Sequence, residues 1–201
     1  MLEKYLVFTG RPNAGKSSII NEITGLNMVI GKRPRTTRRI SEYPLSKGLL
    51  LVDMPGYGKI MGVSERLQYK NNRRIIYFLE SNAHRIAQAV HVLDISTFLE
   101  VTKRLGKKNL FSVDVEMVQL LTKALGELPL VAANKIDKAH KEKIDENLKE
   151  FIQQIRGNGS SAIEGCVYPV SAKTGDGMGA LKSAIHERLV MKGYKTPFKS
   201  H

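Results

Sequence analysis

The decisive stretch of this chain is Gly10-Arg11-Pro12-Asn13-Ala14-Gly15-Lys16-Ser17, which separates an apolar run from a segment of helical periodicity. Lys4–Thr9, on one side, is rich in residues that favour a buried β-strand. On the other side Ile19, Ile20 and Ile23 recur at helical spacing. A glycine-rich turn between a strand and a helix directs backbone N–H groups and the helix N-terminus at an anion, so this stretch predicts a phosphate-binding loop.

Three further motifs follow in a fixed order, and each comes directly after an apolar run. They are Asp53-Met54-Pro55-Gly56, Asn134-Lys135-Ile136-Asp137 and Ser171-Ala172-Lys173. Taken alone, an Asp-x-Pro-Gly segment is no more than a tight turn. All of them in this order predict a guanine-nucleotide switch.

The first two motifs are suited to phosphates and magnesium. Lys16 is expected to bridge the β- and γ-phosphates, while the hydroxyl of Ser17 completes a magnesium shell. Asp53 ends a predicted strand, where its carboxylate can hold the metal through water, and the N–H of Gly56 can reach the γ-phosphate.

The last two motifs are suited to guanine. A single carboxylate, Asp137, can accept both N1–H and the N2 amino group, whereas adenine would leave it unpaired. Asn134 can bind the acceptor edge of the base, the stem of Lys135 can lie over the ring, and the N–H of Ala172 can donate to O6. These features exclude most ATPases and small-molecule kinases that share the phosphate loop.

Strand and helix signals alternate along the chain, which predicts an α/β fold with a mostly parallel sheet covered on both faces. Two strands, at 39–45 and 49–53, are separated by Ser46-Lys47-Gly48 and should form an antiparallel edge pair. Helices are expected at 16–24, 64–82, 114–125, 138–156 and 176–191, with an irregular basic insertion at 96–113 that has room for a short helix. We expect one domain at 1–192 and a basic C-terminal tail at 193–201.

The charge of the chain is strongly positive. Its 201 residues carry 32 Lys and Arg against 19 Asp and Glu, a net charge of +13. The excess is concentrated in three clusters: Lys32, Arg33, Arg35, Arg38 and Arg39; Arg66, Lys70, Arg73 and Arg74; and Lys103, Arg104, Lys107 and Lys108. A polyanion is the natural partner, and RNA fits better than a membrane surface, although a solvated basic face remains the alternative. The sequence has no membrane-spanning run and no signal-peptide pattern, so we expect a cytosolic protein, and the lone Cys166 predicts a buried apolar residue.

Through these motifs the chain resembles GTPases of the Era/EngB type in the translation-factor class, and most of all the EngB family. The resemblance covers about 4–189, and its most specific segment is Asp53-Met54-Pro55-Gly56-Tyr57-Gly58. It implies a Ras-like P-loop NTPase domain with three α/β/α layers and six strands, hydrolysis of GTP, and Mg²⁺ as cofactor. Pro34-x-x-Thr37-Arg38 resembles the first switch of these proteins, with Thr37 as a magnesium ligand and Thr36 as the alternative.

The complete set of predicted site residues follows from the motifs and the resemblance together. For GTP it comprises Gly10, Arg11, Pro12, Asn13, Ala14, Gly15, Lys16, Ser17, Ser18, Thr37, Asp53, Gly56, Asn134, Lys135, Asp137, Ser171, Ala172 and Lys173. Lys16, Thr37 and Gly56 are assigned to catalysis, and Ser17, Thr37 and Asp53 to the metal.

The chain also departs from the usual EngB pattern. Bacterial members carry Thr where Asn134 stands and Ser-Ser where Ser171-Ala172 stands, Lys59 is unusual, and the segment at 96–113 is longer than theirs. These differences indicate a divergent branch, for which an archaeal origin is the candidate. Roles in cell division and septation, which are tied to the bacterial members, therefore carry over less directly than the nucleotide chemistry.

Two positions bear on the rate of hydrolysis. Ras-type switches have a water-orienting glutamine where this chain has Tyr57, so we expect slow intrinsic turnover that a partner or a cation completes. Asn13 matches an asparagine with which related GTPases use K⁺ in place of an arginine finger; packing of the loop explains it equally well.

Three classes of function remain open. The resemblance and the charge favour a monomeric GTPase that assists assembly of the large ribosomal subunit through rRNA contact. Because the Lys32–Arg39 segment lies in the predicted first switch, GTP could reposition it. A signalling switch acting on a protein effector and a membrane-associated GTPase are the alternatives, and the lack of a spanning segment counts against the latter.

Overall fold

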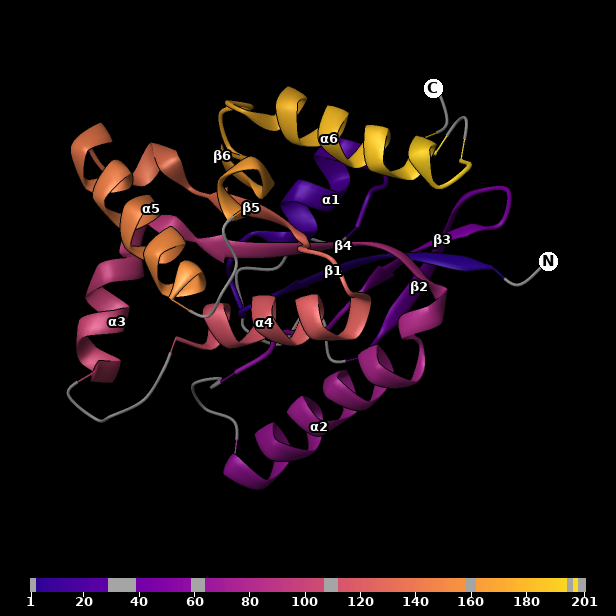
Figure 1. Ribbon diagram of the computed structural model, residues 1–201, viewed down its shortest axis with the longest axis horizontal. Helices are drawn as coiled ribbons and strands as arrows, with labels where there is room; N and C mark the ends of the chain where they lie inside the picture. Colours follow the sequence, from indigo (N-terminus) through magenta and orange to yellow (C-terminus); the bar gives the residue numbers. More distant parts are fainter. Residues whose placement is uncertain are drawn as a thin grey trace.

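A computed structural model describes residues 3–28, 39–58, 64–106, 112–157, 162–194 and 197–198. Six strands form one sheet in the order β2-β3-β1-β4-β5-β6 (Figure 1). The strands are β1 (Lys4–Gly10), β2 (Ser41–Ser46), β3 (Leu49–Asp53), β4 (Ile86–Asp94), β5 (Leu130–Asn134) and β6 (Val167–Val170). Only β2, at the edge, runs antiparallel to its neighbour. The predicted sheet is therefore confirmed, including its antiparallel edge strand.

Helices cover both faces of this sheet (Figure 1). They are α1 (Lys16–Thr24), α2 (Glu65–Ser81), α3 (Phe98–Gly106), α4 (Val113–Leu125), α5 (Lys141–Arg156) and α6 (Met178–Met191). One buried cluster joins α1 and α6 to one face of the sheet, and two others join α2, α4 and α5 to the opposite face. The result is the three-layer arrangement that the alternation of strands and helices predicts.

The central strands explain why both faces need a helical cover. In β5, Leu130 and Ala132 point into the cluster beneath α1 and α6, whereas Val131 and Ala133 point into the cluster beneath α5. Successive side chains of a strand point to opposite faces, so a strand that is apolar throughout must be buried on both sides.

The motifs meet at one rim because the parallel strands end together. Asp94, at the end of β4, lies opposite Asn134 at the end of β5, which in turn lies opposite Val170 at the end of β6. β1 ends at Gly10, and β3 ends at Asp53. Ligands of open α/β sheets bind at the carboxyl ends of the strands.

The segment at 96–113, which we expected to be irregular with room for a short helix, contains the helix α3. Phe98 packs edge-on against Phe151 of α5, with ring centroids 5.3 Å apart. The side chain of Asn147 in α5 accepts a hydrogen bond from the backbone N–H of Leu99 at 3.0 Å. These contacts with α5 stabilise a helical turn that local sequence left undecided.

The segment expected to be a basic tail is partly packed. Tyr194 and Phe198 contact the cluster beneath α6, and the ring of Phe198 lies 6.4 Å from that of His186. Their aromatic surface accounts for this packing, which the count of lysines in the segment concealed.

Some predicted residues lie outside the described ranges: Thr36 and Thr37, most of the Lys32–Arg39 segment, Lys59, and Lys107 and Lys108. Within the described ranges, no helix combines the length and apolarity needed to cross a membrane.

Candidate functional site

The phosphate loop connects β1 to α1, as predicted, and its glycines lie where no side chain fits. Gly15 has a φ of 96°, and a Cβ there would collide with the side chain of Asn134. A Cβ on Gly10 would collide with the carbonyl of Val92 in β4. Ser17 and Ser18 lie partly exposed in the first turn of α1, at the positive end of its dipole. Close contacts with β4 and with the end of β5 therefore fix the backbone of the loop.

Lys16 and Asp53 form a buried ion pair between the phosphate loop and the end of β3. Their side chains are 7% and 1% exposed. Burial lowers the pKa of Lys16 below its usual value, while the charge of Asp53 and its hydrogen bond oppose that shift. The structure thus brings together the residue predicted to bind phosphates and a residue predicted to hold magnesium.

The second-switch segment lies directly against the phosphate loop. A Cβ on Gly56 would come within 2.6 Å of the ring of Pro12. The backbone N–H of Tyr57 donates to the carbonyl of Gly10 at 3.1 Å, and that of Met54 donates to Phe8 at 3.1 Å. The close approach of this segment to Pro12 therefore requires glycine at position 56. Pro12, in turn, packs against the second-switch segment.

The side chain of Tyr57 is partly buried. Its ring packs with the cluster formed by β1, β3, α2 and α4. Burial raises the pKa of Tyr57, and the charge of Glu116 in α4 raises it further. Burial also raises the pKa of Glu116 itself. The ring at the position of the Ras-type glutamine thus serves as a packing group between the second switch and α4.

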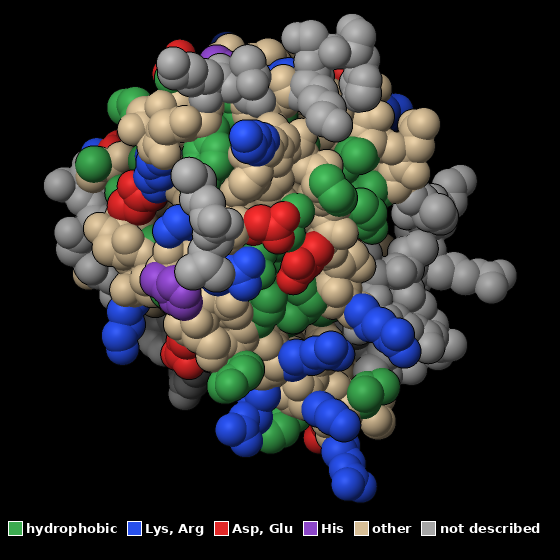
Figure 2. Space-filling model, turned by 90° about the vertical axis from the view of Figure 1, so that its right-hand side faces the viewer, with side chains coloured by type: hydrophobic (Ala, Val, Ile, Leu, Met, Phe, Trp, Pro, Cys, Tyr) green, Lys and Arg blue, Asp and Glu red, His purple; other side chains and the backbone are tan. Residues whose placement is uncertain are grey.

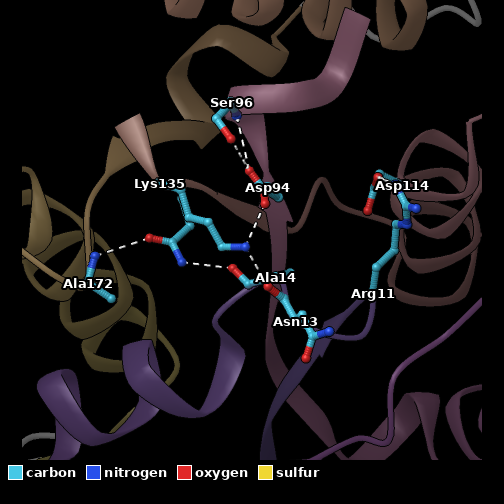
Figure 3. Close-up of polar contacts among 9 residues, drawn as sticks. Arg11, Asn13, Ala14, Asp94, Ser96, Asp114, Lys135 and Ala172 are labelled. Carbon is cyan, nitrogen blue, oxygen red and sulfur yellow. Dashed lines mark hydrogen bonds and ion pairs between the residues drawn. The ribbon is translucent and has the colours of Figure 1, made fainter. Parts of the chain in front are cut away.

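Asn134 joins two of the predicted motifs to each other. Its Nδ2 donates to the carbonyl of Ala14 at 2.8 Å, and its Oδ1 accepts from the N–H of Ala172 at 3.1 Å (Figure 3). The side chain is 3% exposed. Sequence reasoning assigned Asn134 to the base alone; the structure shows that it also holds the phosphate loop against the last motif.

Lys135 extends along the same rim toward β4. Its Nζ donates to the carbonyl of Asn13 at 2.6 Å and contacts the carboxylate of Asp94 at 2.5 Å (Figure 3). Asp94 also accepts from the hydroxyl of Ser96 at 2.6 Å. Lys135 and Asn13 are the non-glycine residues with positive φ in the described chain, at 71° and 63°. The sequence analysis did not identify Asp94 as a site residue. The feature that could have indicated it is a carboxylate at the end of an apolar strand.

The predicted guanine-binding carboxylate lies beside the last motif. Ser171 donates from its hydroxyl to Asp137 at 2.7 Å, and the Nζ of Lys173 lies 3.8 Å from the other carboxylate oxygen. The Ser171 hydroxyl accepts in turn from the N–H of Thr174 at 3.1 Å. The hydrogen bond from Ser171 is the main cause that holds the pKa of Asp137 below its usual value. Asp137 is therefore kept ionised, the form that accepts two hydrogen bonds from a base.

A series of buried polar side chains from β1, β4 and α4 leads to the phosphate loop. The hydroxyl of Thr9 lies 3.0 Å from Nδ1 of His91, whose Nε2 lies 3.2 Å from Asp114 of α4. The other oxygen of Asp114 lies 3.6 Å from the guanidinium of Arg11 (Figure 3). This series of contacts links Arg11 to α4, and no local motif indicated the connection.

Comparison with known proteins agrees with this geometry. A family model described as "50S ribosome-binding GTPase" matches residues 5–158. The "Probable GTP-binding protein EngB" of Methanopyrus kandleri is 36% identical over 193 residues, which cover 94% of each chain.

Two solved structures extend the comparison. A crystal structure of a probable GTP-binding protein EngB superposes with a TM-score of 0.80 at 32% identity, over 93% of this chain and 99% of that one. Era in complex with MgGDPNP and nucleotides of 16S ribosomal RNA shares the fold, with a TM-score of 0.62 at 21% identity over 92% of this chain and 56% of that one. The sequence match over nearly the full length of both chains shows the family directly: this chain belongs to the EngB family of GTP-binding proteins, P-loop GTPases that hydrolyse GTP.

Proposed function

We propose that this chain is a magnesium-dependent GTPase switch of the cytosol that assists assembly of the large ribosomal subunit through contact with rRNA. The observation that carries the proposal is the match of residues 5–158 to a family of 50S ribosome-binding GTPases. The net charge of +13 supports it, because counterion release makes a basic protein bind polyanions. Era, which shares the fold, forms a complex with a fragment of 16S ribosomal RNA.

The donor set at the rim fits magnesium. The hydroxyl of Ser17 at the start of α1 and the carboxylate of Asp53 are hard oxygen ligands, which Mg²⁺ prefers. Bound there, the ion would neutralise charge on the β- and γ-phosphates as water displaces GDP from the γ-phosphorus. Lys16 would exchange its contact with Asp53 for phosphate oxygens. Thr37 remains the proposed first-switch ligand of the metal from outside the described ranges.

Co-sedimentation with purified large ribosomal subunits tests the proposal. The protein is loaded with a non-hydrolysable GTP analogue or with GDP, at moderate salt, and pelleted with the subunits. We expect pelleting that is stronger with the GTP analogue. A protein that stays in the supernatant in both states would contradict the ribosomal role and favour a protein effector.

Potassium dependence of turnover is a separate expectation that rests on Asn13. Its φ of 63° already explains an asparagine there, because Asn tolerates the left-handed region better than most residues. The variant Asn13→Gly keeps this backbone conformation and removes the side-chain amide. We expect wild-type turnover to be faster in K⁺ than in Na⁺ and the difference to vanish in Asn13→Gly. Equal wild-type rates in the two salts would leave loop conformation as the whole role of Asn13.

A further inference from the structure

Helix α2 presents an unusual face to solvent. Arg66, Lys70, Arg73 and Tyr77 follow one another at spacings of four, three and four residues, so they lie on one side of the helix. Tyr69 and Tyr77 are 65% and 72% exposed. The opposite side, with Gln68, Ile75 and Leu79, is buried against the sheet and α4.

The exposed face combines positive charge with aromatic rings. Over its length α2 carries the cations Arg66, Lys70, Arg73 and Arg74 and the anions Glu65 and Glu80. Within the described part of the chain, none of these four cations pairs with a carboxylate. The guanidinium of Arg73 lies 5.8 Å from the ring centroid of Tyr69. Lys and Arg side chains gather over the lower part of the molecule in Figure 2, where α2 lies, with hydrophobic side chains between them.

This chemistry selects one class of partner. A charged helix face alone binds any polyanion, whereas exposed aromatic rings beside the charges add surfaces on which planar groups can stack. Unpaired nucleotides supply both complements, since their phosphates meet the cations and their bases stack on aromatic rings. A duplex keeps its bases stacked on each other and would leave the tyrosines uncovered.

The same helix is bonded to the segment that is predicted to sense the γ-phosphate. Nδ2 of Asn71 donates to the carbonyl of Gly56 at 3.2 Å. Oδ1 of Asn72 accepts from the N–H of Gly58 at 3.2 Å. These two partly exposed asparagines border the buried side of α2, so a displacement of the Gly56–Gly58 backbone would be transmitted to the helix that carries the exposed stripe.

We propose that the exposed face of α2, formed by Arg66, Tyr69, Lys70, Arg73 and Tyr77, docks a single-stranded RNA segment, and that Asn71 and Asn72 couple this docking to the bound nucleotide. The inference rests on the proposed function and deepens it by assigning the RNA contact to one helix. It is independent of the Lys32–Arg39 segment.

Binding of a short fluorescein-labelled single-stranded RNA, followed by anisotropy, tests the proposal with the full chain bound to a non-hydrolysable GTP analogue or to GDP. The double variant Tyr69→Leu/Tyr77→Leu retains apolar bulk and loses the rings. We expect it to weaken binding by at least about tenfold, because a stacked base contributes about 1–3 kcal/mol. The chain has seven Tyr and no Trp, so stacking should also quench its intrinsic emission, and this quenching should shrink in the double variant.

The charged residues are tested against a matched set on another helix. Arg66→Gln/Lys70→Gln/Arg73→Gln removes three exposed charges from α2, and Lys141→Gln/Lys143→Gln/Lys149→Gln removes three from the exposed side of α5. Only the α2 variant should flatten the dependence of log K on log salt, by about 0.7 for each phosphate that the protein no longer neutralises. The variant Asn71→Ala/Asn72→Ala should bind RNA equally in both nucleotide states.

The possible results separate the inference from the proposed function. RNA binding that the α2 and α5 variants weaken to the same extent, or that a duplex matches, would overturn the inference even if large subunits still pellet the protein. Single-strand binding through α2 without pelleting would support the inference and contradict the ribosomal role. If the α2 variants abolish pelleting but bind the single strand like wild type, the face docks a ribosomal protein and the RNA assignment is wrong.

Discussion

Asp137 carries the most sharply testable role of any single residue in the site. Its carboxylate accepts from Ser171 on one oxygen and faces Lys173 with the other. In Asp137→Asn one acceptor becomes an amide donor that opposes the donors of guanine. We expect GTP affinity to fall by roughly 100-fold, from about 3 kcal/mol of lost charged hydrogen bonding. Xanthosine triphosphate, which has a carbonyl in place of the amino group, should bind the variant better than wild type.

Competition against fluorescent GDP, with GTP, ATP and xanthosine triphosphate as competitors, measures this change. The remaining Oδ1 of the variant can still accept from Ser171, so thermal unfolding should be little altered. An unchanged preference for GTP would show that Asp137 does not read the base.

Asn134 and Asn147 allow a matched comparison of two buried asparagines. Asn134 bridges Ala14 and Ala172, and Asn147 bridges Ile95 and Leu99 in the same donor-and-acceptor manner. Each Asn→Ala change leaves one buried backbone carbonyl and one partly buried N–H without its side-chain partner, so we expect both to lower the free energy of unfolding by about 2 kcal/mol, measured in urea. Only Asn134→Ala should weaken GDP binding. Equal GDP affinities in the two variants would limit Asn134 to a general structural role.

Residue by residue, the sequence indicated the motifs but not the partners that hold them. Gly15, Lys16 and Asp53 were found because their chemistry requires fixed spacing along the chain. Asp94 and Asp114 were missed because their partners, Lys135 and Arg11, are distant in sequence. Such a pairing depends on which strands and helices become neighbours, which no local spacing encodes.

At the scale of the element, the second switch is bonded to structure on two sides. Tyr57 packs its ring beside α4, while Asn71 and Asn72 of α2 bond the flanking backbone. A segment held in this way by side-chain contacts can change its arrangement when those contacts change, without unfolding the helix. If Gly56 contacts the γ-phosphate as proposed, this arrangement gives the γ-phosphate a short physical route to α2.

The role of the Tyr57 hydroxyl can be separated from that of its ring. Because burial and Glu116 raise the pKa of Tyr57, its hydroxyl stays protonated and is a poor base. We expect Tyr57→Phe to leave the single-turnover rate of GTP hydrolysis unchanged, whereas a hydroxyl that transferred a proton would contribute on the order of 100-fold. Tyr57→Ala should instead lower the free energy of unfolding by about 2 kcal/mol through lost packing. A large loss of rate in Tyr57→Phe would assign the hydroxyl to the reaction.

Elements whose periodicity is strong were predictable, and those defined by tertiary contacts were not. The apolar pattern of β5 and the amphipathic pattern of α5 are local and sufficient. By contrast, α3 depends on Phe98 meeting Phe151, and the packing of Tyr194 and Phe198 depends on the surface of α6. The lysine content of 193–201 suggested a solvated tail. That count reflects the charge of the segment but not the two aromatic rings that pack beneath α6.

At the scale of the whole molecule, the site draws on most of the sheet. The ends of β1, β3, β5 and β6 carry the motifs, and β4 contributes Asp94. A ligand that contacts all of them links the two helical layers through one set of bonds. Its binding free energy should therefore stabilise the entire domain and not one part of it.

Thermal unfolding with and without ligand tests that expectation. At about one hundred times its Kd, GDP with Mg²⁺ should add about 2.7 kcal/mol to the free energy of unfolding. For a chain of 201 residues this corresponds to a rise in Tm of roughly 5–10 °C in a single transition, while ADP should produce none. In Asp137→Asn, xanthosine diphosphate should raise Tm more than GDP does at the same concentration. A melt that splits, with only one phase shifted by GDP, would contradict the expectation that residues 1–192 unfold as one domain, because nucleotide contacts would then stabilise only part of the sheet.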